Sequence, residues 1–463
     1  MLDQLSERLT GLGAALLPEL FLTGWLVLLL LLEVFGSFKR RRMAFGVALL
    51  GVSAYGLLLF YPDMGKAFGG VLERDTLALG FQQVFVVSTL LTLVLAWADE
   101  GLFVGELGFG EFVFVLSATL LALGILAMAR ELILVFVALE MVAIGGYVLV
   151  HFRFRDQAAE ASLKYLLFGM VSSALMLYGF SWLYGLSGSL LFNDLAGIQY
   201  SRMAFLAVVL VQVGLLFKLS APPFHFWAPD VYEGSAASVA GFLSVGSKAG
   251  GLLVFVRFYA LYDSWEPLLY WVAILSGLAL VVGNTAALWQ TGSKRLMAYS
   301  SVSHTGFLLM AVLAENEGML LFYLWVFLLL NFGVFALIQH IECGQGTDQL
   351  SAFSGWGRMY PLLGVGLVIL MLGLAGLPPT AGLTAKFWLF AVFYERFADD
   401  PPMIVLLLVG VLSSVVGLFY YLKMPFYAFL REGTSAHPPM WWLWITALGL
   451  VGLVLGLFFV PVG

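Results

Sequence analysis

Residues 131–150 read ELILVFVALEMVAIGGYVLV, an apolar run that contains one internal carboxylate, Glu140. A run of about 20 mostly apolar residues is long enough to cross the hydrocarbon core of a bilayer as a helix. The whole chain has this character, since 62% of its 463 residues are hydrophobic, 11% are charged and the mean hydropathy is +1.00. A soluble domain of this length could not bury so much apolar surface. The sequence therefore predicts an integral membrane protein.

The same test along the chain predicts an all-α polytopic membrane protein with about fourteen transmembrane helices. The candidate helices lie near residues 15–34, 43–61, 76–98, 111–129, 131–150, 161–185, 203–226, 237–261, 267–290, 296–314, 318–340, 361–392, 402–422 and 440–460. Because the linkers are short, we expect a single membrane domain over residues 1–463. We divide it into an N-terminal three-helix segment, a first five-helix repeat, a second five-helix repeat and a C-terminal helix, at residues 1–110, 111–261, 267–423 and 440–460.

The repeat is indicated by two proline pairs, Pro222-Pro223 and Pro378-Pro379, in the predicted seventh and twelfth helices. A proline pair removes helix hydrogen bonds, so both helices should be broken. Broken helices at matching positions of two halves are typical of inverted-repeat transporters. Since the two helices are five apart, they run in opposite directions, as inverted repeats of helices 4–8 and 9–13 require. The lysines do not match, because Lys218 precedes its proline pair and Lys386 follows its own.

The orientation follows from the basic residues, which concentrate in cytoplasmic loops. The densest group, Lys39-Arg40-Arg41-Arg42, follows the first predicted helix directly. We therefore expect both termini to lie outside.

Four lysines, Lys164, Lys218, Lys248 and Lys386, fall inside predicted helices. A charge at the bilayer centre costs roughly 2.5–3.5 kcal/mol on the insertion scale, so a purely structural role for the last three is disfavoured. A buried lysine can accept and release protons, which suits a relay. Lys164 lies about one turn inside its helix, where it can either take part or extend to the surface.

Three further residues fit a proton path. Glu140 is surrounded by apolar residues, so we expect a lysine partner, and a structural salt bridge is compatible with that role. His225 follows the first proline pair, and His304 shares a helix face with Ser300 and Ser303. Histidine titrates near neutral pH, although a loop histidine is often structural and hydroxyls also pack helices.

Redox chemistry on this chain is not expected. The only cysteine is Cys343, no glycine-rich nucleotide loop follows a strand pattern, and no histidine pair has the spacing of a haem or zinc site. We therefore predict no cofactor and no metal.

Residues 218–234, KLSAPPFHFWAPDVYEG, closely resemble the seventh-helix signature of the antiporter-like, proton-pumping membrane subunits of respiratory complex I, and the VYEG ending is similar to that of the N-type subunits. Further matches are FVALEMVAIGGYVL at 136–149, EASLKYLLFG at 160–169, KRLMAYSSVSHTG at 294–306 and LAGLPPTAGLTAKFW at 374–388. The departures are SAASVAGF at 235–242, which lacks the usual proline, and Leu383 and Ala385 before the last lysine.

The resemblance implies a proton-translocating subunit of an NADH:quinone oxidoreductase, in which Glu140 pairs with Lys218 and protons pass by Lys248 towards Lys386. It implies a bacterial inner membrane, other membrane subunits of the complex as partners, including M-type and small subunits, and a peripheral redox arm reached through the complex; no nucleic acid is involved. Two alternatives stay open, a subunit of a multi-subunit cation/proton antiporter and a non-transporting scaffold subunit.

Overall fold

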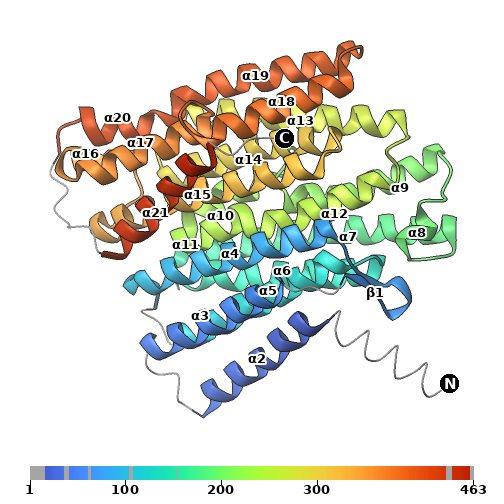
Figure 1. Ribbon diagram of the computed structural model, residues 1–463, viewed down its shortest axis with the longest axis horizontal. Helices are drawn as coiled ribbons and strands as arrows, with labels where there is room; N and C mark the ends of the chain where they lie inside the picture. Colours follow the sequence, from blue (N-terminus) through green and yellow to red (C-terminus); the bar gives the residue numbers. More distant parts are fainter. Residues whose placement is uncertain are drawn as a thin grey trace. The chain divides into compact units, whose positions relative to one another are not determined.

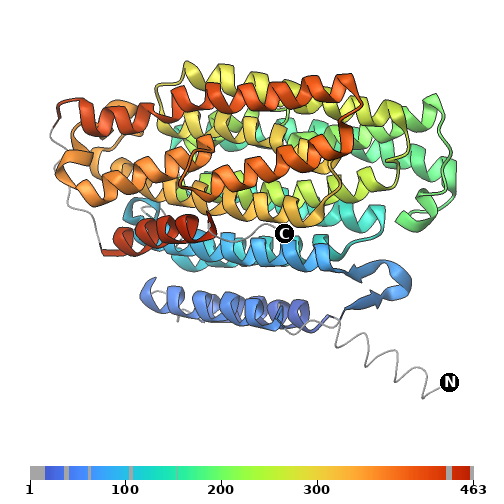
Figure 2. The ribbon, with the colours of Figure 1, turned by 45° about the horizontal axis from the view of Figure 1, so that its top comes forward.

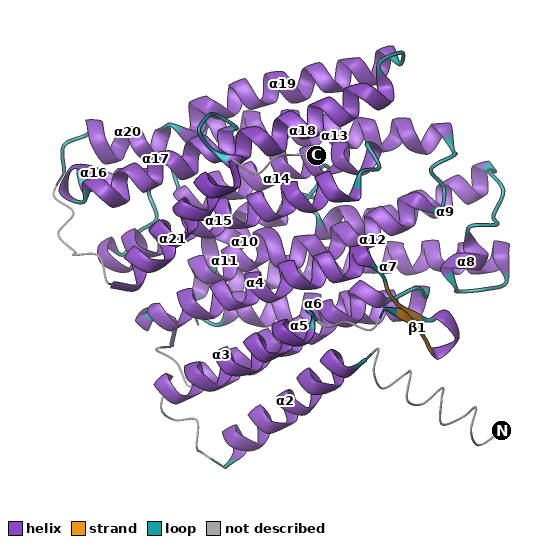
Figure 3. Ribbon diagram, viewed as in Figure 1, coloured by secondary structure: helices purple, strands orange, loops and turns teal. Residues whose placement is uncertain are grey.

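Helices make up nearly all of the chain in the computed structural model, which describes residues 16–35, 41–60, 64–103, 108–153, 155–433 and 441–458 (Figure 3). Ten helical segments in these residues are long and apolar enough to cross a membrane, judged by length and composition. The prediction of an almost all-helical polytopic chain is confirmed at this level. Lys39 and Arg40 lie outside the described residues.

The chain divides into two compact units, of which the first comprises Met1–Lys218 and Gly246–Trp265. Its described elements are α2 (Leu17–Val34), α3 (Arg41–Leu58), β1 (Gly65–Ala67), η2 (Phe68–Gly70), β2 (Leu72–Arg74), α4 (Thr76–Ala98), η3 (Glu100–Phe103), α5 (Phe109–Met128), α6 (Leu132–His151), α7 (Asp156–Ser187), α8 (Phe192–Leu195), α9 (Arg202–Lys218) and α12 (Lys248–Ala260). Successive helices pack on one another from α2 to α7, α7 packs on α9, and α12 packs on α4, α5 and α9 (Figure 1).

The junction between α5 and α6 is built from Ala129, Arg130 and Glu131, where the sequence predicts the shortest link. The Glu131 carboxylate accepts the backbone N–H of Leu134 at 2.8 Å and so caps the start of α6. The backbone N–H of Arg130 donates to the carbonyl oxygen of Val71 at 2.8 Å, which ties the junction to the β1–β2 hairpin. The hairpin itself was predicted as part of a linker, because strands this short show no alternation of apolar and polar residues.

The second unit comprises Leu219–Val245 and Glu266–Gly463. Its described elements are α10 (Trp227–Gly234), α11 (Ala237–Phe242), α13 (Glu266–Leu288), α14 (Ser293–Leu313), α15 (Glu317–Gln345), η5 (Leu350–Phe353), α16 (Trp356–Met359), α17 (Pro361–Ala375), α18 (Ala381–Phe397), α19 (Pro401–Tyr421), α20 (Lys423–Leu430) and α21 (Trp441–Phe458). Helix α14 is the interior helix of this unit, with 94% of its apolar stretch buried. It packs on α10, α13 and α15, as the views in Figure 1 and Figure 2 agree.

The chain leaves the helical conformation at both proline pairs, where the sequence predicts interruptions. Helix α9 ends at Lys218 and α10 begins at Trp227, while α17 ends at Ala375 and α18 begins at Ala381. Proline has no backbone N–H and clashes with the preceding turn, so neither helix can continue through its pair.

The predicted helix 237–261 is helical throughout but irregular. The five-residue segment Leu243–Ser247, labelled η4, is a π-helical turn between α11 and α12. A π turn is rare and is frequently found at functional sites. This one ends directly before Lys248, the first residue of α12.

Candidate functional site

Three of the four lysines singled out by the sequence are buried. The exposed fraction is 5% for Lys218, 1% for Lys248 and 6% for Lys386. The side chain of Lys164 is 41% exposed and forms an ion pair with Glu160, one turn earlier on α7, at 2.8 Å. A helix-surface pair of this kind contributes about 0.3–0.5 kcal/mol. Lys164 therefore differs from the other three, and its role in a relay stays a prediction.

Glu140, on α6, accepts a hydrogen bond from the hydroxyl of Ser173, on α7, with an O–O distance of 2.5 Å. Its carboxylate is close enough to Lys218, at the end of α9, for an electrostatic interaction between the two charges. The described residues contain no direct ion pair between them, since Lys218 Nζ has no hydrogen-bond acceptor there. The first unit thus brings the predicted partners together without a direct bond.

Two neighbours of Lys218 are given by the structure, an aromatic ring and helix α12. The Nζ atom of Lys218 lies 5.7 Å from the centre of the Phe217 ring. Helix α12 approaches closely here, because a Cβ on Gly251 would lie 2.9 Å from Lys218 Cβ. Lys248 is three residues before Gly251, so it lies on the same face of α12. The first unit therefore places Lys248 on the side of α12 that meets Lys218.

In the second unit, the interrupted stretch after α9 is held by α14. The Thr305 hydroxyl donates to the carbonyl oxygen of Leu219 at 2.8 Å, which satisfies a carbonyl that the interruption leaves without a helical partner. His225 lies in this stretch with 7% exposure and its ring is 4.4 Å from that of Phe226. Its Nδ1 has no partner among the described residues.

Helix α10 is fixed from the start of α14 by two basic residues. Arg295 bridges Asp230 and Glu233, each at 2.8 Å. Lys294 donates to the carbonyl oxygen of Ser235 and pairs with Glu342, both at 2.9 Å.

The loop after α15 supports the same end of α14. The Asp348 carboxylate accepts the backbone N–H of Lys294 at 3.2 Å. Burial raises the pKa of this carboxyl group, and the charge of Lys294 opposes that rise.

His304 sits on α14 between two tyrosine hydroxyls. Its Nδ1 lies 2.8 Å from the hydroxyl of Tyr323, and its Nε2 lies 3.1 Å from that of Tyr421. The Tyr421 hydroxyl is also 2.5 Å from that of Ser300. The predicted Ser300 and His304 therefore share one buried hydrogen-bonded network. Hydroxyls can donate and accept, so the network can pass a proton in either direction.

The side chain of Lys386, on α18, reaches back to the second interruption. Its Nζ donates to the carbonyl oxygens of Leu374 and Ala375 at 3.1 and 2.9 Å, at the end of α17. These carbonyls lack helical partners and carry the negative end of the helix dipole, so they favour a cation. Gly376 has φ +85°, and a Cβ there would lie 2.6 Å from Lys386 Cδ. Glycine is required for both reasons.

His304 and Lys386 line the same small cavity. Tyr323, Gly373 and Ala385 also contribute to its wall. Lys386 Nζ also lies 4.7 Å above the ring centre of Phe307, one turn from His304 on α14. The second unit thus brings together a lysine and a histidine that are more than 80 residues apart in sequence.

Sequence reasoning missed the residues that hold these groups. Ser173, Tyr323 and Tyr421 each bond a predicted site residue. A hydroxyl inside an apolar span is the signal that could have found them. Within the described residues, no group of three or more His, Cys, Asp or Glu could hold a metal ion.

Comparison with known proteins gives consistent matches. The family model described as "NADH:quinone oxidoreductase/Mrp antiporter, TM" matches residues 129–417. The chain is 33% identical to NADH-quinone oxidoreductase subunit N 2 of Chloroherpeton thalassium, over 97% of this chain and 93% of that protein.

Solved structures agree. A chain of respiratory complex I from Thermus thermophilus, solved with bound aureothin, is 32% identical with a TM-score of 0.82, over 96% of this chain and 97% of that one. A chain of the Mrp complex from Dietzia sp. is 20% identical with a TM-score of 0.82, over 95% of this chain and 93% of that one. The second likeness is one of fold alone.

Proposed function

The chain belongs to the NADH:quinone oxidoreductase/Mrp antiporter family of membrane subunits, and we propose that it acts as the N-type, proton-translocating subunit of an NADH:quinone oxidoreductase. It is a multi-pass integral membrane protein, and a bacterial plasma membrane fits its relatives. One observation carries the proposal: Lys218 is buried, its Nζ has no acceptor among the described residues, and Glu140 acts on its charge. A buried charge without a bonded partner is energetically costly, which favours a functional role over a purely structural one.

The proposed architecture has fourteen transmembrane helices with both termini outside. Two inverted repeats, helices 4–8 and 9–13, would contain the broken seventh and twelfth helices. Support comes from the interruptions between α9 and α10 and between α17 and α18. Irregular backbone inside a membrane is tolerated only where it faces protein or water, so these stretches suit a transport path.

In the proposed mechanism, redox energy released elsewhere in the complex shifts the pairing between Glu140 and Lys218. The change alters the proton affinity of Lys218 and Lys248, and protons move by way of water and histidines to Lys386 and outward. His225 and His304 would be proton carriers, and Lys164 a peripheral member. No electron passes through this chain. Its partners would be the other membrane subunits, including an M-type subunit and small subunits, and through them the peripheral redox arm.

The test replaces Lys248 by arginine and by alanine. Arginine keeps the charge but cannot release its proton in a protein. We expect Lys248→Arg to assemble and to pump protons poorly, because a relay needs a group that titrates. Proton pumping is measured in proteoliposomes and normalised to assembled complex. If Lys248→Arg pumps like wild type while Lys248→Ala fails to assemble, Lys248 is structural and the proposal falls.

A cation/proton antiporter subunit is the second candidate, because the fold is shared with a chain of an Mrp complex. The two candidates differ in their partners. Purification of the intact complex with a peripheral NADH-oxidising arm supports the first candidate, and a complex of membrane subunits that exchanges sodium for protons supports the second.

A further inference from the structure

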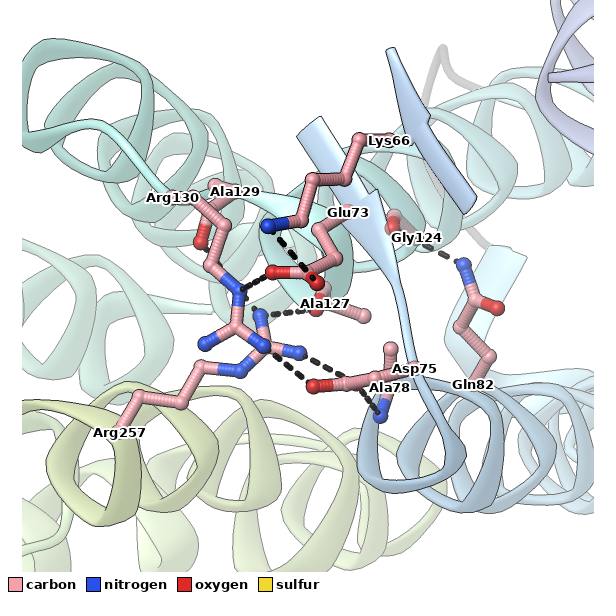
Figure 4. Close-up of polar contacts among 10 residues, drawn as sticks. All are labelled: Lys66, Glu73, Asp75, Ala78, Gln82, Gly124, Ala127, Ala129, Arg130 and Arg257. Atoms are coloured by element: carbon pink, nitrogen blue, oxygen red, sulfur yellow. Dashed lines mark hydrogen bonds and ion pairs between the residues drawn. The ribbon is translucent and has the colours of Figure 1, made fainter. Parts of the chain in front are cut away.

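A cluster of ions surrounds the start of α4 in the first unit, and the proposed mechanism does not use it. Asp75, Arg130 and Arg257 form its centre, and Glu73 and Lys66 extend it to the hairpin (Figure 4). Asp75 is the N-cap of α4, and the other residues come from β1, β2, the α5–α6 junction and α12. The cluster therefore joins segments that are far apart in sequence.

Asp75 is the hub of the cluster. One carboxylate oxygen, Oδ1, caps α4 by accepting the backbone N–H of Ala78 at 2.7 Å and also accepts a hydrogen bond from Arg257 at 2.8 Å. The other oxygen, Oδ2, pairs with Arg130. The Asp75 carboxylate is therefore fixed from three directions, and a group bonded to it is held in place.

Arg257 is the most buried arginine of the cluster, with its side chain 3% exposed. In addition to Asp75, it donates to the carbonyl oxygen of Ala127 and, at 3.4 Å, to that of Ala129. Those carbonyls lie at the end of α5, where a helix leaves acceptors without partners. A planar guanidinium can serve all three acceptors at once, which a lysine ammonium cannot do with the same geometry.

Arg257 also belongs to α12, the helix that begins with Lys248. The two residues are separated by about 13 Å along the helix axis at 1.5 Å per residue. Between them, Gly251 contacts Lys218 and Gly250 contacts Leu123 of α5, where a Cβ would lie 2.6 Å from a methyl group. An axial shift or rotation of α12 would therefore move Lys248 relative to Lys218 and Glu140.

We propose that Arg257 is a positioning residue for proton transfer at Lys248. Its bonds to Asp75 and to the end of α5 fix the height and rotation of α12, and thereby the place of Lys248 opposite Lys218. This inference rests on the proposed relay role of Lys248. A misplacement of about 1 Å can lower the rate of a reaction that depends on geometry by up to about 100-fold. The bonds of Arg257 to Asp75 and to the end of α5, here called the clamp, therefore change the rate of proton transfer although Arg257 does not carry the proton.

The test uses two variants that break the same bond from either side, in the assembled complex. Arg257→Gln removes the guanidinium. Asp75→Ser removes both carboxylate oxygens but keeps a hydroxyl that can cap α4, since serine caps helices as well as aspartate. We expect each to lower the rate of proton pumping, normalised to assembled complex, by about fivefold. The double variant should lose less than the sum of the two single effects, because both variants remove the Arg257–Asp75 bond. Arg257→Lys should restore part of the loss.

Lys66→Gln is the matched control. It removes a cation from the same cluster, but Lys66 pairs with Glu73 and not with Asp75. Hydrogen exchange of the peptide covering residues 248–260 gives a readout that does not depend on pumping. We expect faster exchange there in Arg257→Gln and Asp75→Ser, and wild-type exchange and pumping in Lys66→Gln.

The outcomes separate this inference from the proposed function. Unchanged exchange of α12 in Arg257→Gln, or an equal loss of pumping in Lys66→Gln, overturns the clamp. If α12 exchanges faster in Arg257→Gln but this variant pumps normally, and Lys248→Arg does not pump, then Arg257 does not position Lys248 and the proposed relay stands. If Lys248→Arg also pumps normally, the relay itself is wrong and Arg257 is only a structural clamp.

Discussion

The Nζ atom of Lys386 lies 2.9 Å from the carbonyl oxygen of Ala375, the last residue of α17. The lysine that follows the second proline pair thus reaches back across the interruption and satisfies the helix end that the prolines create. The same ammonium group lines the cavity that His304 also lines. The proposed relay would therefore use a side chain that also bonds the end of the broken helix.

The two roles of Lys386 can be separated by Lys386→Gln and Lys386→Met. Glutamine keeps hydrogen-bond donors for the carbonyls of Leu374 and Ala375, whereas methionine leaves them buried and unsatisfied, at about 1–3 kcal/mol. We expect Lys386→Gln to assemble well without pumping, and Lys386→Met to assemble poorly. Complex content on native gels and pumping in proteoliposomes are the measurements.

Lys423→Gln is the control for Lys386. Lys423 likewise donates to carbonyls at and just after the end of α13, those of Leu288 and Gln290, and these bonds involve neither Lys386 nor His304. It should retain pumping. Wild-type pumping by Lys386→Gln would remove Lys386 from the path.

Ser173→Ala tests the support of Glu140. The substitution deletes the hydroxyl that donates to Glu140 Oε1. A hydrogen bond to a charged group contributes about 1.5–3 kcal/mol, so we expect pumping to fall by roughly tenfold with assembly unchanged. Ser172→Ala is matched to it, because Ser172 donates only to the backbone carbonyl of Phe168. Equal behaviour of the two variants would mean that the Ser173 bond is unimportant.

Because two tyrosine hydroxyls bond the ring of His304, we expect the loss of either hydroxyl to lower proton pumping to a similar extent. Tyr323→Phe and Tyr421→Phe each remove one partner of the His304 ring. With one ring nitrogen unsupported, the tautomer and orientation of the ring are no longer fixed, and we expect a several-fold loss of pumping in both. Tyr232→Phe, which loses a hydroxyl 3.5 Å from Ser301 in the same unit, should pump normally. A loss as large in Tyr232→Phe would show that any buried hydroxyl matters.

We expect substitution of Lys294 and substitution of Arg295 to lower the stability of the complex by unequal amounts. The Lys294–Glu342 pair is buried, with side chains 2% and 10% exposed, whereas Arg295 and its partners are each about a third exposed. Removing one partner of a buried pair costs about 3–5 kcal/mol, and an exposed pair contributes about 0–1 kcal/mol. Lys294→Met should therefore lower the melting temperature of the purified complex far more than Arg295→Met. A similar decrease for both variants would contradict this ranking.

Lys164→Gln should change little. Its ammonium group is partly exposed and paired with Glu160 on the helix surface. We expect pumping to fall by less than about twofold, against a far larger loss for Lys218→Gln in the same assay. A loss as large as that of Lys218→Gln would bring Lys164 into the relay.

The sequence alone predicted an almost all-helical membrane chain and the places where two helices break. Apolar length indicated the spans because lipid admits few other structures, and the proline pairs indicated the interruptions because proline cannot donate a helix hydrogen bond. Charges inside those spans identified Lys218, Lys248, Lys386 and Glu140, since a buried charge is costly wherever it lies.

Only the tertiary structure decided which groups meet. The partners of His304 lie on α15 and at the end of α19, and those of Arg257 lie before α4 and at the end of α5. No periodicity in the sequence relates these segments, because their contacts depend on how helices pack. The π-helical turn before Lys248 was equally hidden, since one inserted residue in a turn leaves the apolar composition of the helix unchanged.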